Sequence, residues 1–594
     1  MSSKRYFYIF LILLLLAFVA VGIFNVLVDP FGLFGDRIMD WYSYNMTQNP
    51  RTAKIEYLKD KDEFDSFIVG ASGSAAFPTE ELNEYTGGNF YNTFYYGADM
   101  KDSLDTVNYL IDNYQVENIF LPIGFAFADT YDVGNDNLNN TMHHRLDGAN
   151  PLYFYGQYLL ADPNYGLNKI QSYREDTIIQ QSFDVFNIED GSYDKFLRDI
   201  EPISDLESYL AREEYRQFEA GLGRDRSLDS MDEFISSMEE LVSLTDENDI
   251  NLIVLVSPLY HEDFQHYDLA QVEEFYTSLA SVVPYWDFTR SSISYDARYF
   301  YDRTHWRNDV GSMMLARIFE NEEAYIPEDF GIYIDEDPSP AIQNYVEEIH
   351  IDPQDYSQEL TVLMYHHIEK EGNGASIISQ DAFRGQMEEI VEQGYETVTI
   401  DDLIAYVDYG IDLPENPILI TFDDGYSSNY EIAYPIMEEL GLNGIIFPIG
   451  HSVAMDEYKD TGEKIYPHFT IEEAREMNHV FEYGSHTFDM HQAEYLEDGY
   501  KIRRNVGMLE GESEEDYIED FRADHEKIDE IVQEINEGPT KAFAYPSGVY
   551  EDLAAILLRE EGVRVTFLTD EDTNILVKGL KQSLLGLSRY NMTD

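Results

Sequence analysis

ILITFDDGY, at residues 418–426, is an apolar run that ends in two adjacent carboxylates, Asp423 and Asp424, followed by a glycine. A short apolar run bounded by turn residues is typical of a buried strand. Two like charges at the end of such a strand repel each other, so either water solvates both or a cation lies between them. A solvated Asp-Gly turn is the simpler interpretation. The residues around this stretch decide between the two.

The region around this stretch, residues 359–594, alternates short apolar strands with amphipathic helical patterns. Strands are predicted at 360–368, 396–400, 417–422, 444–450, 480–487, 541–548 and 564–570. About seven strand–helix units favour an irregular (β/α) barrel, in which the chemistry lies at the carboxyl ends of the strands. Asp423, His486 and Pro546 fall at predicted strand ends, so we expect them at one rim.

A second motif, GSHTFDMH, places His486 and His491 five residues apart. In a helix these side chains would point about 140° apart, and in a strand they would face opposite ways. They can therefore share a ligand only where a strand breaks into a loop, which the preceding Gly-Ser permits. With Asp424 they predict a metal site of two histidines and one carboxylate that leaves a coordination position for water. Asp423 is then left to take a proton from the attacking water.

TFDDG (421–425), SHTFDMH (485–491) and AYPSG (544–548) resemble, in this order, the motifs of polysaccharide deacetylases of carbohydrate esterase family 4, or NodB-homology type. The resemblance covers residues 357–594. It implies that Asp423 is the general base and that the Tyr545 backbone N–H, beside Pro546, binds the oxyanion. It also implies a divalent metal, with zinc ahead of cobalt, nickel or iron. The implied metal ligands are Asp424, His486 and His491.

The chain departs from the wider family at two points. Where the family has an arginine two residues before the motif proline, this chain has Ala544, and we expect Arg589 to replace it. The family's late general-acid histidine is also missing. In circularly permuted poly-N-acetylglucosamine deacetylases, which the chain resembles here, a histidine after a tyrosine in the first strand takes that role. This is His366, and His367, which faces the other way, is expected to be packed or to support the site.

The first region, residues 29–321, also alternates strands and helices. Strands are predicted at 65–70, 89–96, 118–124 and 250–258. Short apolar strands between amphipathic helices predict a three-layer α/β domain with a parallel sheet covered on both faces. Residues 131–230 lack such strands and predict a long helical insertion, and the acidic residues 322–358 predict a linker.

Three motifs of the first region predict a nucleophile site. IVGASGS (68–74) puts Ser72 directly after a strand, and YDRTHWR (301–307) supplies Asp302 and His305. With Gly97, they resemble SGNH-type esterases and acyltransferases over residues 60–320. The resemblance makes Ser72 the nucleophile, His305 the base and Asp302 its orienting group, with the Gly97 N–H toward the oxyanion. Ala126 stands where the family has an asparagine donor, so a domain that binds glycan without cleaving it stays an alternative.

The N-terminus predicts a membrane anchor. Lys4 and Arg5 precede the uncharged residues 6–28, which as a helix would span about 35 Å, enough to cross a bilayer. The two cations favour a cytoplasmic N-terminus, so residues 1–28 form a tip and single-pass anchor in the cell membrane, with both domains outside. A cleaved signal peptide is the alternative, although no small-x-small cleavage site follows the apolar run.

Composition limits the function classes. The chain has no cysteine, which excludes disulfides, thiolate nucleophiles and cysteine–metal sites. The 115 acidic and 38 basic residues give a net charge of −77, which excludes nucleic acid as a partner. The 44% hydrophobic content identifies a folding chain. We interpret the acidity as a solvated surface suited to high salt, with attraction to a cationic polymer as the alternative.

Together with the N-terminal apolar run, the two resemblances imply an extracellular, metal-dependent N-deacetylase of N-acetylglucosamine polysaccharide, coupled to a domain that acts on O-acyl groups. Its expected partners are the polysaccharide, the membrane and other exopolysaccharide-synthesis proteins. Two alternatives stay open: a substrate of peptidoglycan or chitin-like type, and a non-catalytic membrane-anchored scaffold that binds polysaccharide.

Overall fold

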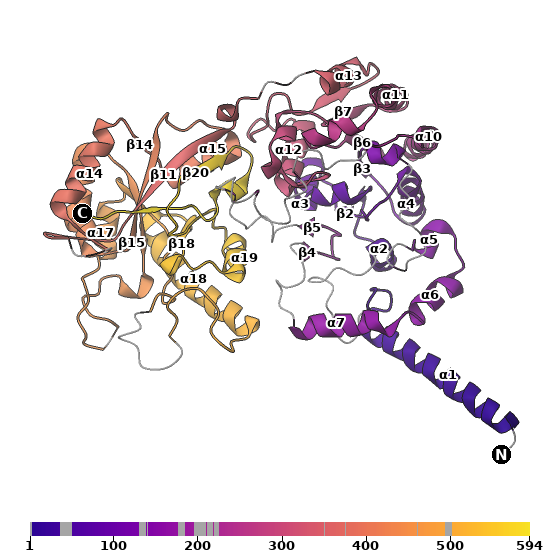
Figure 1. Cartoon of the computed structure of the whole chain (residues 1–594), viewed down its shortest axis with the longest axis horizontal. Helices are drawn as coiled ribbons and strands as arrows, with labels where there is room; N and C mark the ends of the chain where they lie inside the picture. The colour runs from indigo at the N-terminus through magenta and orange to yellow at the C-terminus, as the bar shows by residue number, and fades with distance from the viewer. Residues whose placement is uncertain are drawn as a thin grey trace. The chain divides into compact units, whose positions relative to one another are not determined.

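The structure is a computed structural model of a mixed α/β chain (Figure 1). The described residues are 3–35, 50–129, 138, 141–175, 185–194, 203, 210, 218, 225–347, 349, 351–372, 374, 376–459, 461–492 and 502–594. They divide into two compact units. The first unit is Met1–Arg198, Glu213–Glu322 and Ile326–Ile351, and the second is Asp199–Arg212, Glu323–Tyr325 and Asp352–Asp594.

The first unit is built on a largely parallel sheet in the order β10-β7-β6-β3-β1-β2. Its strands are β1 (Ser66–Ile68), β2 (Phe90–Asn92), β3 (Asn118–Ile123), β6 (Asn251–Val256), β7 (Tyr285–Asp287) and β10 (Ile332–Ile334). Only the β10–β7 pair of this sheet is antiparallel among the described strands. The parallel sheet that the sequence predicts for this region is thus present.

Both faces of this sheet are covered. Ile119 and Leu121 of β3 pack into one core with the helices α4 (Met100–Asn113), α10 (Met231–Glu247) and α11 (Leu269–Ala280). Phe120, which points the other way, packs edge-on against Phe77 with ring centroids 4.9 Å apart. On that side lie α3 (Thr79–Thr86) and α12 (Asn308–Ile318), which contact each other. A strand buried on both faces must be apolar at successive positions, which explains the run at 119–123.

Residues 322–358 differ from the predicted acidic linker. They contain β10 and α13 (Ser339–Val346), and Ile334, Ala341 and Tyr345 are buried in the core of the first unit. The predicted insertion at 131–230 is helical in α5 (His144–Asp147), α6 (Pro151–Leu159) and α7 (Pro163–Glu175), and it also holds the short strands β4 (Val185–Phe186) and β5 (Tyr193–Asp194). Much of the remainder lies outside the described residues.

The second unit contains a sheet in the order β17-β16-β15-β11-β20, with β14 beside β15 and β21 beside β11. The strands are β11 (Ser357–Tyr365), β14 (Glu396–Thr397), β15 (Pro417–Asp424), β16 (Gly444–Pro448), β17 (Phe481–Tyr483), β20 (Asn574–Val577) and β21 (Tyr590–Asn591). A parallel pair, β18 (Ala542–Ala544) and β19 (Val565–Phe567), joins its neighbours through the bridges Ser485–Phe543 and Phe567–Leu587. The irregular barrel stays a prediction.

The apolar composition of β15, the strand that ends in the two carboxylates, is explained by burial on both faces. Ile418, Ile420 and Phe422 pack into one core, and Leu419 packs into another on the opposite face. The surrounding helices are α14 (Gln380–Glu392), α15 (Ile400–Tyr409), α16 (Tyr434–Leu440), α17 (Ile471–Glu476), α18 (Glu514–Asn536) and α19 (Asp552–Glu560). The apolar run therefore delivers Asp423 and Asp424 to the carboxyl end of a fully buried strand.

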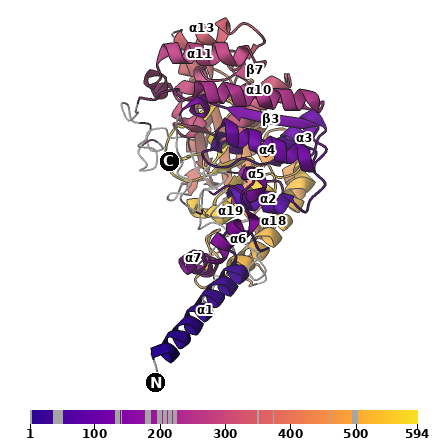
Figure 2. The ribbon, with the colours of Figure 1, turned by 90° about the vertical axis from the view of Figure 1, so that its right-hand side faces the viewer.

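The N-terminal helix α1 (Ser3–Val28) is long and apolar enough to cross a membrane by length and composition. Residues 4–20 are exposed, whereas the last two turns are partly buried in the first unit. Figures 1 and 2 show α1 projecting from this unit, with α6 and α7 beside its C-terminal end. The helix is consistent with either an anchor or a signal sequence.

Candidate functional site

Three predicted metal ligands of the second unit lie together. Asp424 ends β15 in a left-handed conformation (φ 69°), and Gly425 follows with φ 84°. Asp424 Oδ1 lies 3.7 Å from His486 Nε2 and 3.8 Å from His491 Nε2. The ligand atoms of the three side chains all lie within 4.8 Å of one another. The loop that the sequence requires after β17 is present, since His486 and His491 follow the strand end at Tyr483.

The hydrogen bonds of this cluster orient it toward a cation. His486 Nδ1 donates to the Ala544 carbonyl (2.8 Å) and His491 Nδ1 donates to the Arg504 carbonyl (2.9 Å). A carbonyl only accepts, so each Nδ1 carries the proton and each Nε2 presents a lone pair. Asp424 Oδ1 is buried with no hydrogen-bond partner among the described residues. Three acceptors facing one another fit a divalent metal.

The second oxygen of Asp424 is held separately. Its Oδ2 accepts a hydrogen bond from the Tyr426 hydroxyl (2.9 Å), which fixes the rotation of the carboxylate. Burial opposes ionisation of Asp424, but nearby positive charge, that of His366 first, outweighs it and keeps the pKa of Asp424 below the ordinary value. Burial lowers the pKa of His486 to about 4, so this ring is neutral at physiological pH. Both groups are therefore in the protonation state that a metal ligand needs.

A buried ion pair holds Asp423. Arg589 donates from Nη1 to Asp423 Oδ1 (2.7 Å) and from Nη2 to Oδ2 (2.9 Å), and it also donates from Nε to the Leu568 carbonyl (2.8 Å). Asp423 is 2% exposed and Arg589 is fully buried. Burial opposes ionisation of Asp423, but the Arg589 guanidinium and the nearby histidines keep its pKa well below the ordinary value. Asp423 is thus ionised beside the cluster.

The two early histidines take different positions. His366 Nε2 lies 4.0 Å from Asp423 Oδ2, and its Nδ1 is buried without a partner among the described residues. His367 turns away: its Nδ1 lies 2.9 Å from Ser428 Oγ, and its ring packs against Tyr466 with centroids 4.2 Å apart. The structure thus brings His366, and not His367, beside Asp423.

The turn after β18 requires a correction. The Tyr545 backbone N–H, expected to bind the oxyanion, instead donates to the Phe567 carbonyl (3.0 Å). That amide is engaged with the neighbouring strand and is not available to a substrate. Pro546, which follows it, has no N–H to offer. The expectation failed because it depended on how this strand pairs, which the motif does not specify.

The sequence did not predict a role for Asp524. This buried residue of α18 accepts hydrogen bonds from the backbone N–H groups of Phe488 (2.7 Å) and Asp489 (2.6 Å), inside the loop between the two metal-site histidines. The available signal was its position: Phe521, Asp524 and Ile528 lie on the buried stripe of an amphipathic helix. A carboxylate on such a stripe needs polar partners.

The predicted nucleophile site of the first unit is also assembled. His305 Nε2 lies 2.7 Å from Ser72 Oγ, and His305 Nδ1 lies 2.7 Å from Asp302 Oδ2. Asp302 ends β8 (Phe300–Asp302) and His305 begins β9 (His305–Trp306), a short hairpin in which the two residues pair directly. Ser72 begins a 3-10 turn just after β1. The arrangement has the order serine, imidazole, carboxylate.

Gly97 is the predicted oxyanion donor of the first unit. Gly97 lies in a turn after β2 with φ 60°, and its role as an oxyanion donor stays a prediction.

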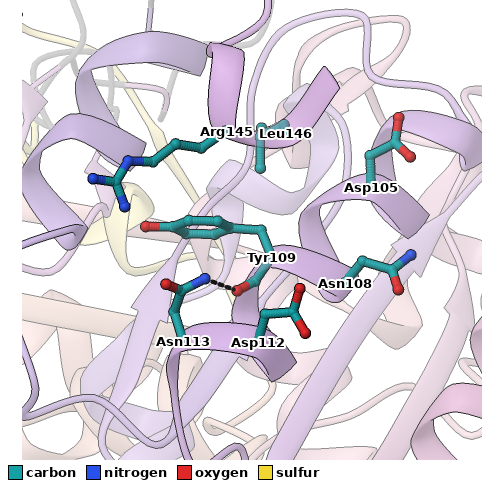
Figure 3. Close-up of a pocket in the computed structure, with 7 residues that line it drawn as sticks. All are labelled: Asp105, Asn108, Tyr109, Asp112, Asn113, Arg145 and Leu146. Atoms are coloured by element: carbon teal, nitrogen blue, oxygen red, sulfur yellow. Dashed lines mark hydrogen bonds between the residues drawn. The ribbon is translucent and has the colours of Figure 1, made fainter. Parts of the chain in front are cut away.

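Figure 3 shows a polar hollow between α4 and α5, where Tyr109 lies between Arg145 and Asn113. Its lining contains neither the triad nor any metal-site residue, so it is a separate surface feature.

The region that contains this cluster matches a known protein family. The sequence model of the polysaccharide deacetylase family matches residues 410–566. The C-terminal region contains a polysaccharide deacetylase domain. The matched residues include Asp423 and both metal-site histidines, while His366 and Arg589 lie outside them. β11 and β21 bring these two into the deacetylase domain, because β11 pairs with β15 and with β21.

Several curated proteins are similar to the deacetylase domain. YxkH of Bacillus subtilis (strain 168) is 35% identical over 132 residues, which are 22% of this chain and 43% of YxkH. The poly-beta-1,6-N-acetyl-D-glucosamine N-deacetylase of Escherichia coli (strain K12) is 26% identical over 221 residues, 34% of this chain and 33% of the relative. The protein of the same name from Staphylococcus aureus (strain MRSA252) is 24% identical over 200 residues, which are 33% of this chain and 61% of the relative. The chain thus spans less than two thirds of each relative.

Solved structures similar to part of this chain include IcaB from Ammonifex degensii, with 24% identity and a TM-score of 0.31 over 39% of this chain and 91% of that one. A de-N-acetylase from Aggregatibacter actinomycetemcomitans has 18% identity and a TM-score of 0.34, over 40% and 95%.

Proposed function

We propose that the deacetylase domain removes acetyl groups from N-acetylglucosamine units of an extracellular polysaccharide. The observation that carries this proposal is the unpartnered, buried Oδ1 of Asp424, which faces the Nε2 atoms of His486 and His491 beside an ionised Asp423. The similarity to poly-beta-1,6-N-acetyl-D-glucosamine N-deacetylases supports this substrate class.

A divalent metal held by Asp424, His486 and His491, zinc first and cobalt, nickel or iron next, would polarise the acetamide carbonyl and acidify the attacking water. Asp423 accepts the proton of that water, and the Arg589 guanidinium keeps both of its oxygens in place while it does so. His366, 4.0 Å from Asp423, protonates the departing nitrogen. The product is a primary amine, cationic at neutral pH.

The test uses the full chain and short β-1,6- and β-1,4-linked N-acetylglucosamine oligomers, with acetyl loss followed by mass spectrometry. We expect metal-dependent loss that a chelator abolishes and that Asp423→Asn reduces by about 100-fold or more. Asp401→Asn, which changes an exposed carboxylate of the same unit, serves as the matched control and should stay fully active. The preferred oligomer identifies the linkage.

The alternatives give different results in the same experiment. Activity on peptidoglycan or chitin-like fragments, with none on either oligomer series, would move the substrate to those polymers. Metal binding without acetyl loss from any substrate would favour a non-catalytic scaffold that binds polysaccharide. Removing the metal through His486→Ala should then leave polysaccharide binding unchanged, whereas the enzyme would lose activity.

A second activity is favoured by the triad of the first unit. Ser72, His305 and Asp302 are joined in succession by contacts of hydrogen-bond length, so we propose an SGNH-like O-acyl esterase or acyltransferase there. Ser72→Ala should abolish release of acetate from O-acetylated polysaccharide, while the exposed Ser243→Ala should not. A parent with no activity toward O-acyl groups, in hydrolysis or transfer, would leave the first unit as a glycan-binding domain.

We also propose that α1 is a retained single-pass anchor with both units outside the cell. Support comes from its C-terminal end, where Asn25 is fully buried and Val28 is 6% exposed. Asp29, just after the helix, accepts hydrogen bonds from the backbone N–H groups of Leu33 and Phe34. Cleavage after the apolar run would remove the buried Asn25 and Val28 from the folded unit, so we expect the N-terminus of the purified membrane protein to be Met1.

A further inference from the structure

One face of α6 is apolar and exposed. Residues 151–161, PLYFYGQYLLA, carry no charge in a chain whose net charge is −77. Leu152 is 86% exposed, Tyr153 66%, Leu159 37% and Leu160 51%. With Gly156, whose position opens onto empty space, they share one side of the helix at the spacing i, i+1, i+4, i+7 and i+8.

The opposite face of the same helix is packed. Phe154 and Tyr158 are buried against Phe31 and Leu33, the residues that follow α1. The Asn150 side chain caps the first turn by accepting from the backbone N–H groups of Leu152 and Tyr153. The helix is therefore fixed in orientation, and its apolar outer face is not a by-product of fraying.

The C-terminal end of α6 is attached to α1 at a defined point. Asn25 Nδ2 donates to the carbonyls of Leu159 (3.1 Å) and Ala161 (2.9 Å), and a side chain at Gly22 would meet Leu159. Crossing the hydrocarbon core takes about 20 helical residues. Counted from the first residue after the cations Lys4 and Arg5, that number ends near Asn25. The point of attachment thus coincides with the far interface of a bilayer that α1 would cross.

The neighbouring helix α7 continues the surface. Gly166 packs against Phe24 of α1, and Leu167, next to it, is 52% exposed. Figures 1 and 2 both show α6 and α7 at the end of α1, where it enters the first unit. Apolar helices with tyrosine at this depth match the composition of interfacial segments.

We propose that the outer face of α6, together with Leu160 and Leu167, lies in the lipid interface around the point where α1 leaves the membrane. The inference rests on the proposal that α1 crosses the bilayer. Its occupant is the outer leaflet, because the surface continues from the apolar surface of α1 at the depth that Asn25 fixes. The face is uncharged, so acyl chains and headgroup carbonyls rather than charged headgroups recognise it.

The test exploits the absence of cysteine from the chain. Single cysteines replace Leu152, Tyr153 or Leu160 in the full chain. Each introduced cysteine is labelled with an environment-sensitive fluorophore, and the labelled protein is reconstituted in phosphatidylcholine–phosphatidylglycerol vesicles. Leu269→Cys and Tyr333→Cys, at exposed apolar positions elsewhere in the first unit, are the matched controls. Leu13→Cys reports on α1 itself.

We expect nitroxide-labelled lipid to quench most of the emission at positions 152, 153 and 160 and to leave the two controls unchanged. Iodide, which quenches from the water, should quench the two controls and leave positions 152, 153 and 160 largely unchanged. Labels on α6 that iodide quenches as well as the controls, while position 13 is quenched by lipid, would overturn the inference and leave the anchor intact. No lipid quenching at position 13 would instead overturn the anchor. Protection of α6 in detergent that depends on protein concentration would identify a second copy as the occupant and overturn the inference.

Discussion

At the scale of single residues, the most consequential contact is the ion pair between Arg589 and Asp423. Both side chains are buried, and both carboxylate oxygens accept from the guanidinium. A buried carboxylate without its partner is costly, because water does not reach it to compensate for the lost guanidinium charge. The pair therefore contributes to the stability of the second unit and helps to keep Asp423 ionised.

Arg589→Gln should destabilise the second unit by about 3–5 kcal/mol, because it leaves the Asp423 carboxylate buried and uncompensated. It should also raise the pKa of Asp423 and so shift the acid limb of the pH–rate profile upward. Denaturant unfolding and pH-dependent acetyl release measure the two effects. Arg522→Gln, which removes an exposed partner of Glu560, should change stability by less than about 0.5 kcal/mol. Equal stability of Arg589→Gln and the parent would contradict the structure.

A buried histidine predicts how stability depends on pH. Burial lowers the pKa of His468 to about 4. Between its ordinary pKa of 6.5 and this value the unfolded chain binds a proton that the folded chain does not, so stability falls as the pH falls. The loss is about 1.4 kcal/mol per pH unit, or about 3 kcal/mol across the window.

The variant His468→Asn should make this acid dependence shallower by the share of His468, since His486 keeps its own, whereas the exposed His479→Asn should not change it. Hydrogen exchange of the second unit in denaturant, with chelator present and at a series of pH values, measures the difference. Parallel curves for parent and His468→Asn between pH 6.5 and 4 would show that this histidine is protonated in the folded chain.

Sequence reasoning worked at the residue scale where a role follows from residue type and strand position. The cluster of Asp424 with two histidines is predictable from the sequence in this way. Arg589 does lie against Asp423, while its role as the substitute for the missing arginine stays a prediction. The hydrogen bond of the Tyr545 amide is not predictable, because backbone hydrogen bonding depends on which strand lies alongside. Such pairing is a property of the whole sheet.

At the scale of elements, α18 holds the loop that carries His486 and His491, the candidate metal ligands. Asp524 holds two successive backbone N–H groups of this loop, although it lies more than thirty positions away in sequence. Residues that orient metal ligands from outside are worth about 10–100-fold in metal affinity. No motif marks such a residue, because its partners are backbone atoms.

Asp524→Ala should weaken zinc binding by about 10–100-fold, since the loop loses both acceptors. Asp524→Asn keeps an acceptor oxygen and should restore part of the affinity, which a simple loss of packing would not allow. Competition with a chromogenic chelator measures the affinity, and Glu526→Gln on the exposed side of α18 is the control. Unchanged zinc affinity in Asp524→Ala would show that the loop holds itself.

Elements at the edge of the first unit were harder to predict. β10 and α13 lie in an acidic stretch with weak apolar periodicity, yet Ile334, Ala341 and Tyr345 are buried. Three apolar residues in a polar segment do not establish a period, so the sequence favoured a linker there. The parallel strands β3 and β6 were predicted because their runs are continuous and apolar. The short strand β7, which pairs parallel with β6, was not predicted.

At the scale of the whole molecule, the net charge of −77 opposes compaction. Raising sodium chloride from about 0.1 to 1 M shortens the screening length from about 10 to 3 Å. The temperature of unfolding should therefore rise by several degrees over this range, measured by calorimetry. Potassium chloride should give the same rise, because screening depends on ionic strength and not on the cation. A flat or falling dependence would show that charge repulsion does not limit the stability of the folded chain.

The attachment of α1 through Asn25 has a mechanical consequence. A spanning helix longer than the local hydrocarbon thickness tilts to stay within it. Because Asn25 donates to the carbonyls of Leu159 and Ala161 at the end of α6, a tilt of α1 would be transmitted to this helix of the first unit. A thinner bilayer would lean the unit toward the surface and a thicker one would lift it upright. If α1 spans the membrane as proposed, the thickness of the bilayer would set the angle between the first unit, with Ser72, and the membrane surface.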